Sequence, residues 1–165
     1  MTSITGIYRD RLWTPAATPV DRGWRSNIVV DQARLALASF MKGEEEAFGI
    51  RVLQVGAGDE AWDQQGAPAP VATTTELVDP VDDREIDPEQ IVFLDETGAE
   101  VDGPTSRVQV TVEYEPGEPA EEVALREFGL FGELLGELYM IDYVRHPVLN
   151  KGAQDTLERV IRLRF

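Results

Sequence analysis

The chain has 165 residues, no cysteine and a formal net charge of −16, with 31 acidic against 15 basic side chains. A chain of this length fits one domain, which buries roughly 70% of the surface that its unfolded form exposes. The lack of cysteine excludes disulfides, thiolate metal sites and cysteine nucleophiles. We find no signal-peptide pattern and no apolar run that would span a membrane, so we expect a protein made in the cytoplasm, without membrane insertion.

The acidic excess lies in the middle of the chain. Residues 41–122 carry four basic against 22 acidic side chains, whereas the flanking segments are close to neutral. Such a surface repels phosphate backbones, so we expect no direct nucleic-acid binding. Arg outnumbers Lys thirteen to two. This ratio suits interface ion pairs, because a guanidinium binds a carboxylate in two places, but high-GC codon usage or a high-salt habitat produces it as well.

The first 25 residues mix prolines, glycine and aromatic side chains without helical or strand periodicity. We interpret residues 1–25 as an extended docking arm whose aromatic anchors are Tyr8, Trp13 and Trp24. An apolar helical stripe follows, and it predicts an amphipathic N-terminal helix of about 16 residues that starts at a Ser26 cap. The stripe consists of Val29, Ala33, Ala36, Leu37 and Phe40.

Short strands dominate the remaining chain. Residues 106–114 alternate apolar and polar side chains without a fault, which is typical of a half-buried antiparallel strand. Segment 56–89 holds four prolines, with seven acidic residues between 76 and 89, and predicts a long acidic surface loop. Further strands are expected at 50–55, 90–95, 123–132, 137–144 and 157–165. The fold class is therefore α+β, one domain over residues 26–165 with a mainly antiparallel sheet or sandwich.

The final strand has two distinct faces. Leu157, Ile161, Leu163 and Phe165 fall on one side, which we expect to be buried in the core. Arg162 and Arg164 fall on the other side. We expect these two arginines to contact a neighbouring subunit or the acidic loop.

Two sequence patterns resemble ligand-binding sites, but their charges or spacing disfavour binding of the ligand. Residues 56–61, GAGDEA, imitate a dinucleotide fingerprint after a strand, yet Asp59 and Glu60 place negative charge where a pyrophosphate would bind. We interpret this segment as a tight turn. The acidic residues between 79 and 87 offer oxygen ligands for a hard cation, but their spacing fits no EF-hand loop, so they predict a solvated loop. We expect no cofactor and no metal.

His146 is the only histidine in the chain. It stands between Arg145 and Pro147, and no nucleophile or carboxylate is marked as its partner. The last two strands are expected to be joined by the segment 145–156, so we interpret His146 as a strand-end or interface residue. No pair of carboxylates stands out for acid–base chemistry either. We therefore name no catalytic residue and expect that the protein is not an enzyme.

The C-terminal third carries a series of short motifs in a fixed order. The motif residues are Glu127, Gly129, Leu130, Phe131, Pro147, Lys151, Asp155, Thr156, Leu157 and Phe165. The order of these motifs resembles that in tail, baseplate and fibre-attachment proteins of tailed phages and phage-tail-like contractile injection particles, and the resemblance extends over about residues 26–165. It implies a structural subunit that is present in several copies per particle, first in the cytoplasm during assembly and then in a virion or tail-like particle. Its implied partners are other tail or baseplate subunits, or a fibre.

Two other functions stay open at this stage. One is a carbohydrate- or receptor-binding module at a tail tip, in which Trp13, Trp24 and Trp62 would stack on sugars. The other is a hydrolase with an acidic site. For the structural function we name Tyr8, Trp13, Trp24, Arg162 and Arg164 as interface residues.

Overall fold

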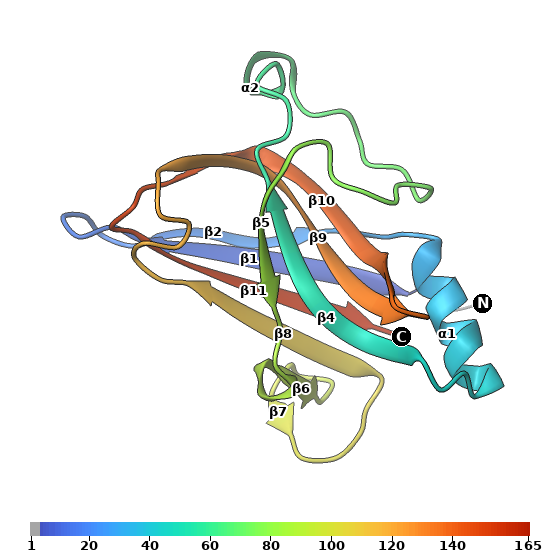
Figure 1. The fold of residues 1–165 in the computed structure, drawn as a ribbon. Coiled ribbons are helices and arrows are strands. Elements are labelled where there is room, and N and C mark those ends of the chain that lie inside the picture. The colour runs from blue at the N-terminus through green and yellow to red at the C-terminus, as the bar shows by residue number, and fades with distance from the viewer. Residues whose placement is uncertain (1–3) are drawn as a thin grey trace. The chain divides into compact units, whose positions relative to one another are not determined.

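The computed structural model describes residues 4–165, and the chain groups into two compact units. The first unit comprises the residues up to Asn27, Asp87–Val123 and Lys151–Phe165. The second unit comprises Ile28–Ile86 and Ala124–Asn150, so the sequence expected as one domain contributes to both. Each unit is built on one sheet (Figure 1), and the paired strands run antiparallel. The predicted mainly antiparallel β fold is therefore confirmed.

The first unit holds a six-stranded sheet in the order β2-β1-β11-β8-β6-β7. Its strands are β1 Thr5–Trp13, β2 Val20–Ser26, β6 Ile91–Leu94, β7 Glu100–Val101, β8 Arg107–Tyr114 and β11 Thr156–Arg164. A short 3-10 helix, η1 Pro88–Gln90, leads into β6. The strands β1 and β11 lie side by side (Figure 1), so the two ends of the chain form the middle of this sheet.

The predicted extended arm is wrong, because residues 5–26 form β1 and β2 within this sheet. Strand β1 pairs with β11 along all of its nine residues. The strand pattern was masked by Asp10, which lies on the buried face of β1 where an apolar residue is expected. Arg159 of β11 neutralises it, with Nε 2.7 Å from Oδ1 of Asp10. The first three residues of the predicted arm lie outside the described residues.

Alternate residues of β8 and β11 form the core of the first unit, as their patterns predicted. The buried set comprises Val110, Val112, Tyr114, Leu157, Ile161 and Leu163. Phe165 departs from the prediction, because β11 ends at Arg164 and the Phe165 side chain is 43% exposed. The strand ends one residue too early to carry this ring into the core.

The second unit holds a five-stranded sheet in the order β3-β10-β9-β4-β5. Its strands are β3 Ile28–Val29, β4 Ala47–Gly56, β5 Pro80–Glu85, β9 Val123–Leu134 and β10 Glu137–Lys151. Two helices accompany them, α1 Gln32–Lys42 and α2 Trp62–Gln65. A central cluster consists of Val30, Leu77, Phe131, Met140 and Tyr143, with Ile28 and Val52 packed against it.

The N-terminal helix is not borne out as predicted. Within residues 4–165 three strands precede α1, and the third of them, β3, pairs with Asp142 and Tyr143 of β10. The chain therefore enters the helix only at Gln32, well after Ser26, and α1 has 11 residues. Tertiary pairing of a short β-branched segment decides this boundary against the helical periodicity.

The segment predicted as a long acidic loop, 56–89, is only partly a loop. It contains α2 and the edge strand β5, which pairs with β4. The sequence of β5, PVDDRE, lacks an apolar face because most of this edge strand is exposed, so strand periodicity could not reveal it.

His146 lies inside β10, not at a strand end, and its side chain is only 3% exposed. The predicted link over 145–156 is therefore wrong for its first seven residues, since β10 continues to Lys151. Pro147 has no N–H to give to a ladder, which favours a strand end in sequence-based prediction. Within residues 4–165, β3 pairs with β10 at Asp142 and Tyr143 alone, so no bond to β3 requires that missing donor.

Candidate protein-binding face

Four of the five predicted interface residues lie on one face of the first sheet. Trp13 is on β1, Trp24 is on β2, and Arg162 and Arg164 are on β11. The strand registers place further arginines on the same face. We call it the arginine face, defined by Arg9, Arg11, Arg107, Arg162, Arg164, Trp13 and Trp24. Tyr8 points to the opposite side and is 3% exposed, so its assignment as an interface residue is wrong.

Guanidinium groups stack on the tryptophan rings of this face. The Cζ atoms of Arg162 and Arg9 lie 4.4 and 5.9 Å from the ring centroid of Trp24, and Arg11 lies 5.6 Å from that of Trp13. Each contact is favourable because the ring face carries negative potential. The stacking holds the long side chains in fixed positions, so less conformational entropy is lost when a partner binds.

Polar contacts fix the same arginines from their other sides. Arg9 donates from Nε to Oδ1 of Asp21 at 3.0 Å, and this hydrogen bond lowers the pKa of Asp21 to about 2. Arg162 donates from Nε to Oε1 of Gln109 at 2.8 Å. Burial and then the charge of Arg9 lower the pKa of Arg162 from its usual high value, so the Arg162 cation gains from an anionic partner.

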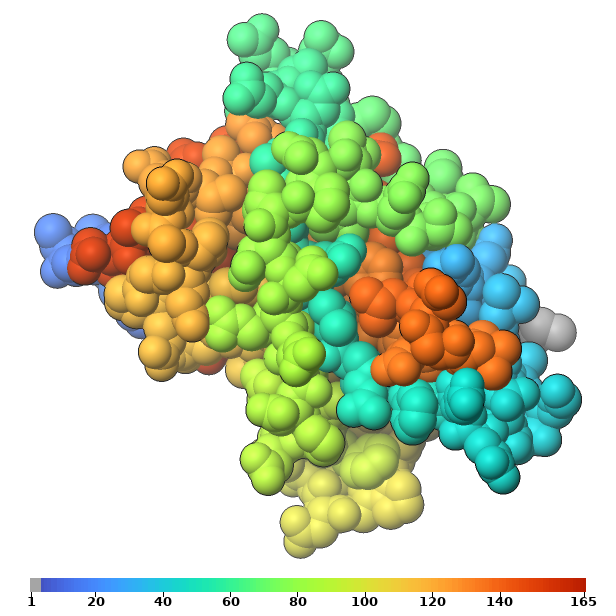
Figure 2. Space-filling model, viewed as in Figure 1, coloured from blue at the N-terminus to red at the C-terminus, as the bar shows by residue number. Residues whose placement is uncertain are grey.

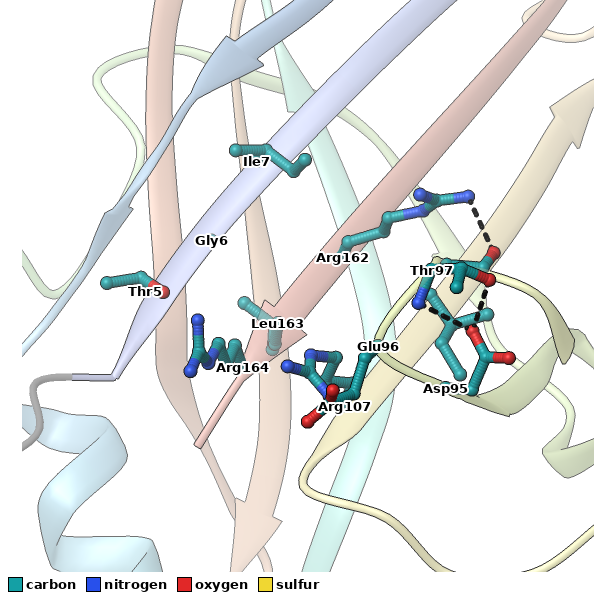
Figure 3. Close-up of a pocket in the computed structure, with 12 residues that line it drawn as sticks. Thr5, Gly6, Ile7, Asp95, Glu96, Thr97, Arg107, Arg162, Leu163 and Arg164 are labelled. Atoms are coloured by element: carbon teal, nitrogen blue, oxygen red, sulfur yellow. Dashed lines mark hydrogen bonds between the residues drawn. The ribbon is translucent and has the colours of Figure 1, made fainter. Parts of the chain in front are cut away.

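A pocket of about 250 Å³ opens at the end of the arginine face, where Thr5–Ile7 and the turn after β6 meet β11 (Figure 3). The turn is held by the carboxylate of Asp95, which accepts hydrogen bonds from N and Oγ1 of Thr97 at 2.8 and 2.7 Å. These bonds lower the pKa of Asp95, the side-chain bond from Thr97 most. Gly98 has a φ of +87°, a left-handed conformation that favours glycine at this position of the turn.

Two arginines of the pocket form no ion pair in the described part of the chain, although Glu96 also lines the pocket. Arg107 and Arg164 stand directly opposite each other on β8 and β11, an arrangement that is unfavourable for like charges. Within residues 4–165 neither side chain forms an ion pair, and both line the pocket with Arg162. A carboxylate bound here would relieve the repulsion and accept hydrogen bonds from planar donors. The arginine face is thus suited to an acidic protein surface.

Stacked arginines also bear on the carbohydrate hypothesis. Trp62 of α2 carries Arg145, with Cζ 4.9 Å from its ring centroid, so each of the three tryptophans has a guanidinium over its ring. A sugar that stacks on an aromatic ring needs a free ring face, and these rings already have a preferred occupant. This observation counts against the proposed stacking of sugars on Trp13, Trp24 and Trp62.

His146 lines a separate pocket in the second unit, of about 430 Å³. Its Nδ1 lies 2.8 Å from the carbonyl oxygen of Pro147 and therefore carries a proton, and its ring lies 6.1 Å from that of Phe128 between centroids. The lining carboxylate Asp63 is held by Arg126, with nitrogen–oxygen distances of 2.7 and 2.8 Å. These contacts give His146 and Asp63 defined structural partners.

The glycine-rich segment before α2 is a turn, as expected from its charges. Asp59 accepts a hydrogen bond from N of Ala61 at 2.8 Å, so a carboxylate already occupies the start of this four-residue helix. A Cβ on Gly56 would lie 2.7 Å from the side chain of Glu127, which explains that glycine by close packing.

Sequence reasoning missed Arg9, Arg11 and Arg107 as parts of the candidate face. Their signal was the spacing of two between Arg9 and Arg11, which is visible only once residues 5–13 are read as a strand. It named Glu127 as a motif residue but could not predict the contacts of Glu127 with Val78, Asp79 and Tyr143, because these residues are far from it in the chain.

Comparison of the chain with protein-family models, curated proteins and solved structures gave no match. In residues 4–165 we find no helix with the length and apolar character needed to cross a bilayer. Nor do three His, Cys, Asp or Glu side chains of the described part gather in a way that would hold a metal ion.

Proposed function

We propose that the chain is a non-enzymatic structural or adaptor subunit of a phage tail, baseplate or tail-like injection particle. Its arginine face binds a carboxylate-bearing surface of a neighbouring subunit or fibre. The observation that carries this proposal is the pair Arg107 and Arg164, which face each other across β8 and β11 and line the pocket, and neither of which forms an ion pair within residues 4–165. Arginine and tryptophan are the side chains that most often supply binding energy in protein interfaces.

The motif residues behind the resemblance have structural roles, which supports a scaffold over a reactive centre. Glu127 accepts hydrogen bonds from N of Val78 and N of Asp79 at 3.1 and 2.8 Å, and another from the hydroxyl of Tyr143. It thereby fixes the segment that leads into β5. A Cβ on Gly129 would lie 2.9 Å from the ring of Phe131, so this glycine allows close packing.

The later motif residues close the connection between β10 and β11. Lys151 donates from Nζ to the carbonyl oxygen of Glu115 at 3.1 Å, and its side chain is 1% exposed. Asp155 accepts a hydrogen bond from N of Gly152 at 2.7 Å, which defines the turn. These residues hold the backbone in place. We therefore expect proteins that share this motif pattern to share a structural scaffold.

The proposal is tested by following the chain in the organism that encodes it. A tagged copy should sediment with tail particles, where electron microscopy would locate it as a repeated subunit. The variant Arg107→Gln with Arg164→Gln should reduce incorporation roughly tenfold or more, since each lost charged contact in an interface is worth about 2 kcal/mol or more. The matched control is Arg25→Gln with Arg34→Gln, two exposed arginines that are not part of this face.

Two results would count against it. A chain that stays outside the particle fraction under conditions in which particles form would overturn the function. A double variant that is incorporated as well as the wild type would show that the arginine face is not the contact.

A further inference from the structure

Helix α1 exposes the apolar side chains that a surface helix normally buries. Its buried residues are two alanines, Ala33 and Ala36. Leu35, Leu37, Phe40 and Met41 are all exposed, Met41 to 89%. In a chain with a net charge of −16, this concentration of exposed apolar area is a sign of a binding surface.

The turn between β9 and β10 adds a second, independent sign. Its central residues, Leu135 and Gly136, have φ of +54° and +80°. A two-residue hairpin with positive φ at both positions favours Asn-Gly, because a branched apolar side chain is strained there. Leu135 is nevertheless 59% exposed, so packing within the chain does not explain it. Strain at an exposed apolar residue indicates a function for that side chain.

The helix and the hairpin meet at the same end of the second sheet (Figures 1 and 2). The backbone N of Leu135 donates to the carbonyl oxygen of Glu46 at 2.9 Å, in the segment that joins α1 to β4. Phe48 follows on β4 and Leu138 on β10, both exposed. We call this surface the apolar end. It is defined by Leu37, Phe40, Met41, Phe48, Leu135 and Leu138.

Carboxylates surround the apolar end. Three come from the segment between α1 and β4, and two from the strands on either side of the hairpin turn. They are Glu44, Glu45, Glu46, Glu133 and Glu137. Two apolar ends facing each other would place these acids against one another, which disfavours a symmetric contact. A surface complementary to the apolar end would carry positive charge around an apolar centre.

The same chain carries such a surface. On the arginine face, Ile7 and Trp24 are 37% and 39% exposed and lie among the guanidinium groups of Arg9, Arg162 and Arg164. We infer that the apolar end of one copy binds the arginine face of a second copy, with Leu135 inserted among the aromatic and aliphatic side chains. The inference rests on the proposed function, because it uses the same face. A head-to-tail contact of this kind propagates into a ring or a filament.

The substitution Leu135→Asn separates binding from folding. Asparagine suits the left-handed turn position, so the variant should be at least as stable in thermal unfolding as the wild type. Because Leu135 becomes buried in the contact between copies, its loss should weaken self-association roughly ten- to a hundredfold. We would measure the association of the full chain by sedimentation equilibrium at about 50 mM NaCl, where charge complementarity is screened little.

A mixing experiment then tests the pairing of the two surfaces. Leu135→Asn removes one surface, and Arg107→Glu with Arg164→Glu removes the other. Each variant alone should be a monomer, whereas their equimolar mixture should form a 1:1 dimer and nothing larger, because only one productive contact is left.

Three outcomes would overturn the inference. The wild type is monomeric up to about 1 mM, or the arginine variant still associates with itself, or the mixture stays monomeric. A monomeric wild type that still enters tail particles leaves the proposed function intact. A chain that assembles with itself but never enters particles would support the inferred self-association and overturn the proposed function.

Discussion

At the scale of single residues, Asp10 and Arg159 form an ion pair that is almost completely buried. Nε and Nη2 of Arg159 lie 2.7 and 2.8 Å from the two carboxylate oxygens of Asp10. Their side chains are 1% and 0% exposed. A buried pair gives little net stability compared with apolar residues, but the loss of one partner leaves an uncompensated charge in the core.

We therefore expect Asp10→Asn to destabilise the chain by about 3–5 kcal/mol, measured by urea unfolding. The double variant Asp10→Leu with Arg159→Met should recover most of this loss, because it removes both charges. Asp21→Asn serves as the control, since Asp21 pairs with Arg9 at the surface and should change stability little. Equal effects of Asp10→Asn and Asp21→Asn would show that the buried pair is not special.

At the scale of elements, the strands with an apolar run or an alternating pattern were predicted, whereas β1, β2, β3, β5 and β7 were missed. Strand β8 was found because its apolar residues alternate along the strand, and β11 was found because Leu157, Ile161 and Leu163 keep the pattern in spite of the buried Arg159 between the first two. Strand β1 was missed because its buried face includes Asp10, whose partner Arg159 is 149 positions away. Periodicity detects apolar burial only, so a charged pair that replaces an apolar contact is invisible to it.

Helix α1 shows a different case, in which only part of the predicted stripe is buried, namely Ala33 and Ala36. Leu37 and Phe40 belong to the predicted stripe, yet they are 37% and 41% exposed. A sequence pattern reports that a face is apolar, but it does not report whether the chain itself or a partner covers that face. The candidate site, the arginine face, was also predicted only in part. Trp13, Trp24, Arg162 and Arg164 lie on it as predicted, whereas Tyr8 faces the core.

The pairing of β1 with β11 gives a prediction for the segment first taken as an arm. We expect residues 5–26 to resist limited proteolysis in the free chain, because their backbone is held in a sheet by β11. The sites of cleavage would be identified by mass spectrometry. The loop around residues 67–73 serves as the internal control, since it lies outside helices and strands and should be cut first. Early cleavage within β1 would contradict the pairing.

At the scale of the whole molecule, the distribution of charge destabilises the folded chain and favours association between copies. Residues 41–122 hold most of the acidic excess, whereas the arginine face is built from β1, β8 and β11. Repulsion among the carboxylates raises the free energy of the folded chain. Attraction between the carboxylates around the apolar end of one copy and the arginine face of another lowers the free energy of the assembled pair of copies.

Salt should therefore act in opposite directions on folding and on association. The screening length falls from about 10 Å at 0.1 M salt to about 3 Å at 1 M. Raising NaCl across this range should increase the free energy of unfolding of the monomer, because 31 acidic groups outnumber 15 basic ones and net repulsion is what salt removes. The same change should weaken the binding of Leu135→Asn to the arginine variant in the mixing experiment. Urea unfolding and sedimentation at each salt concentration would measure the two effects. Association that strengthens with salt would mean that apolar contact alone drives it, and that the arginines of β8 and β11 do not select the partner.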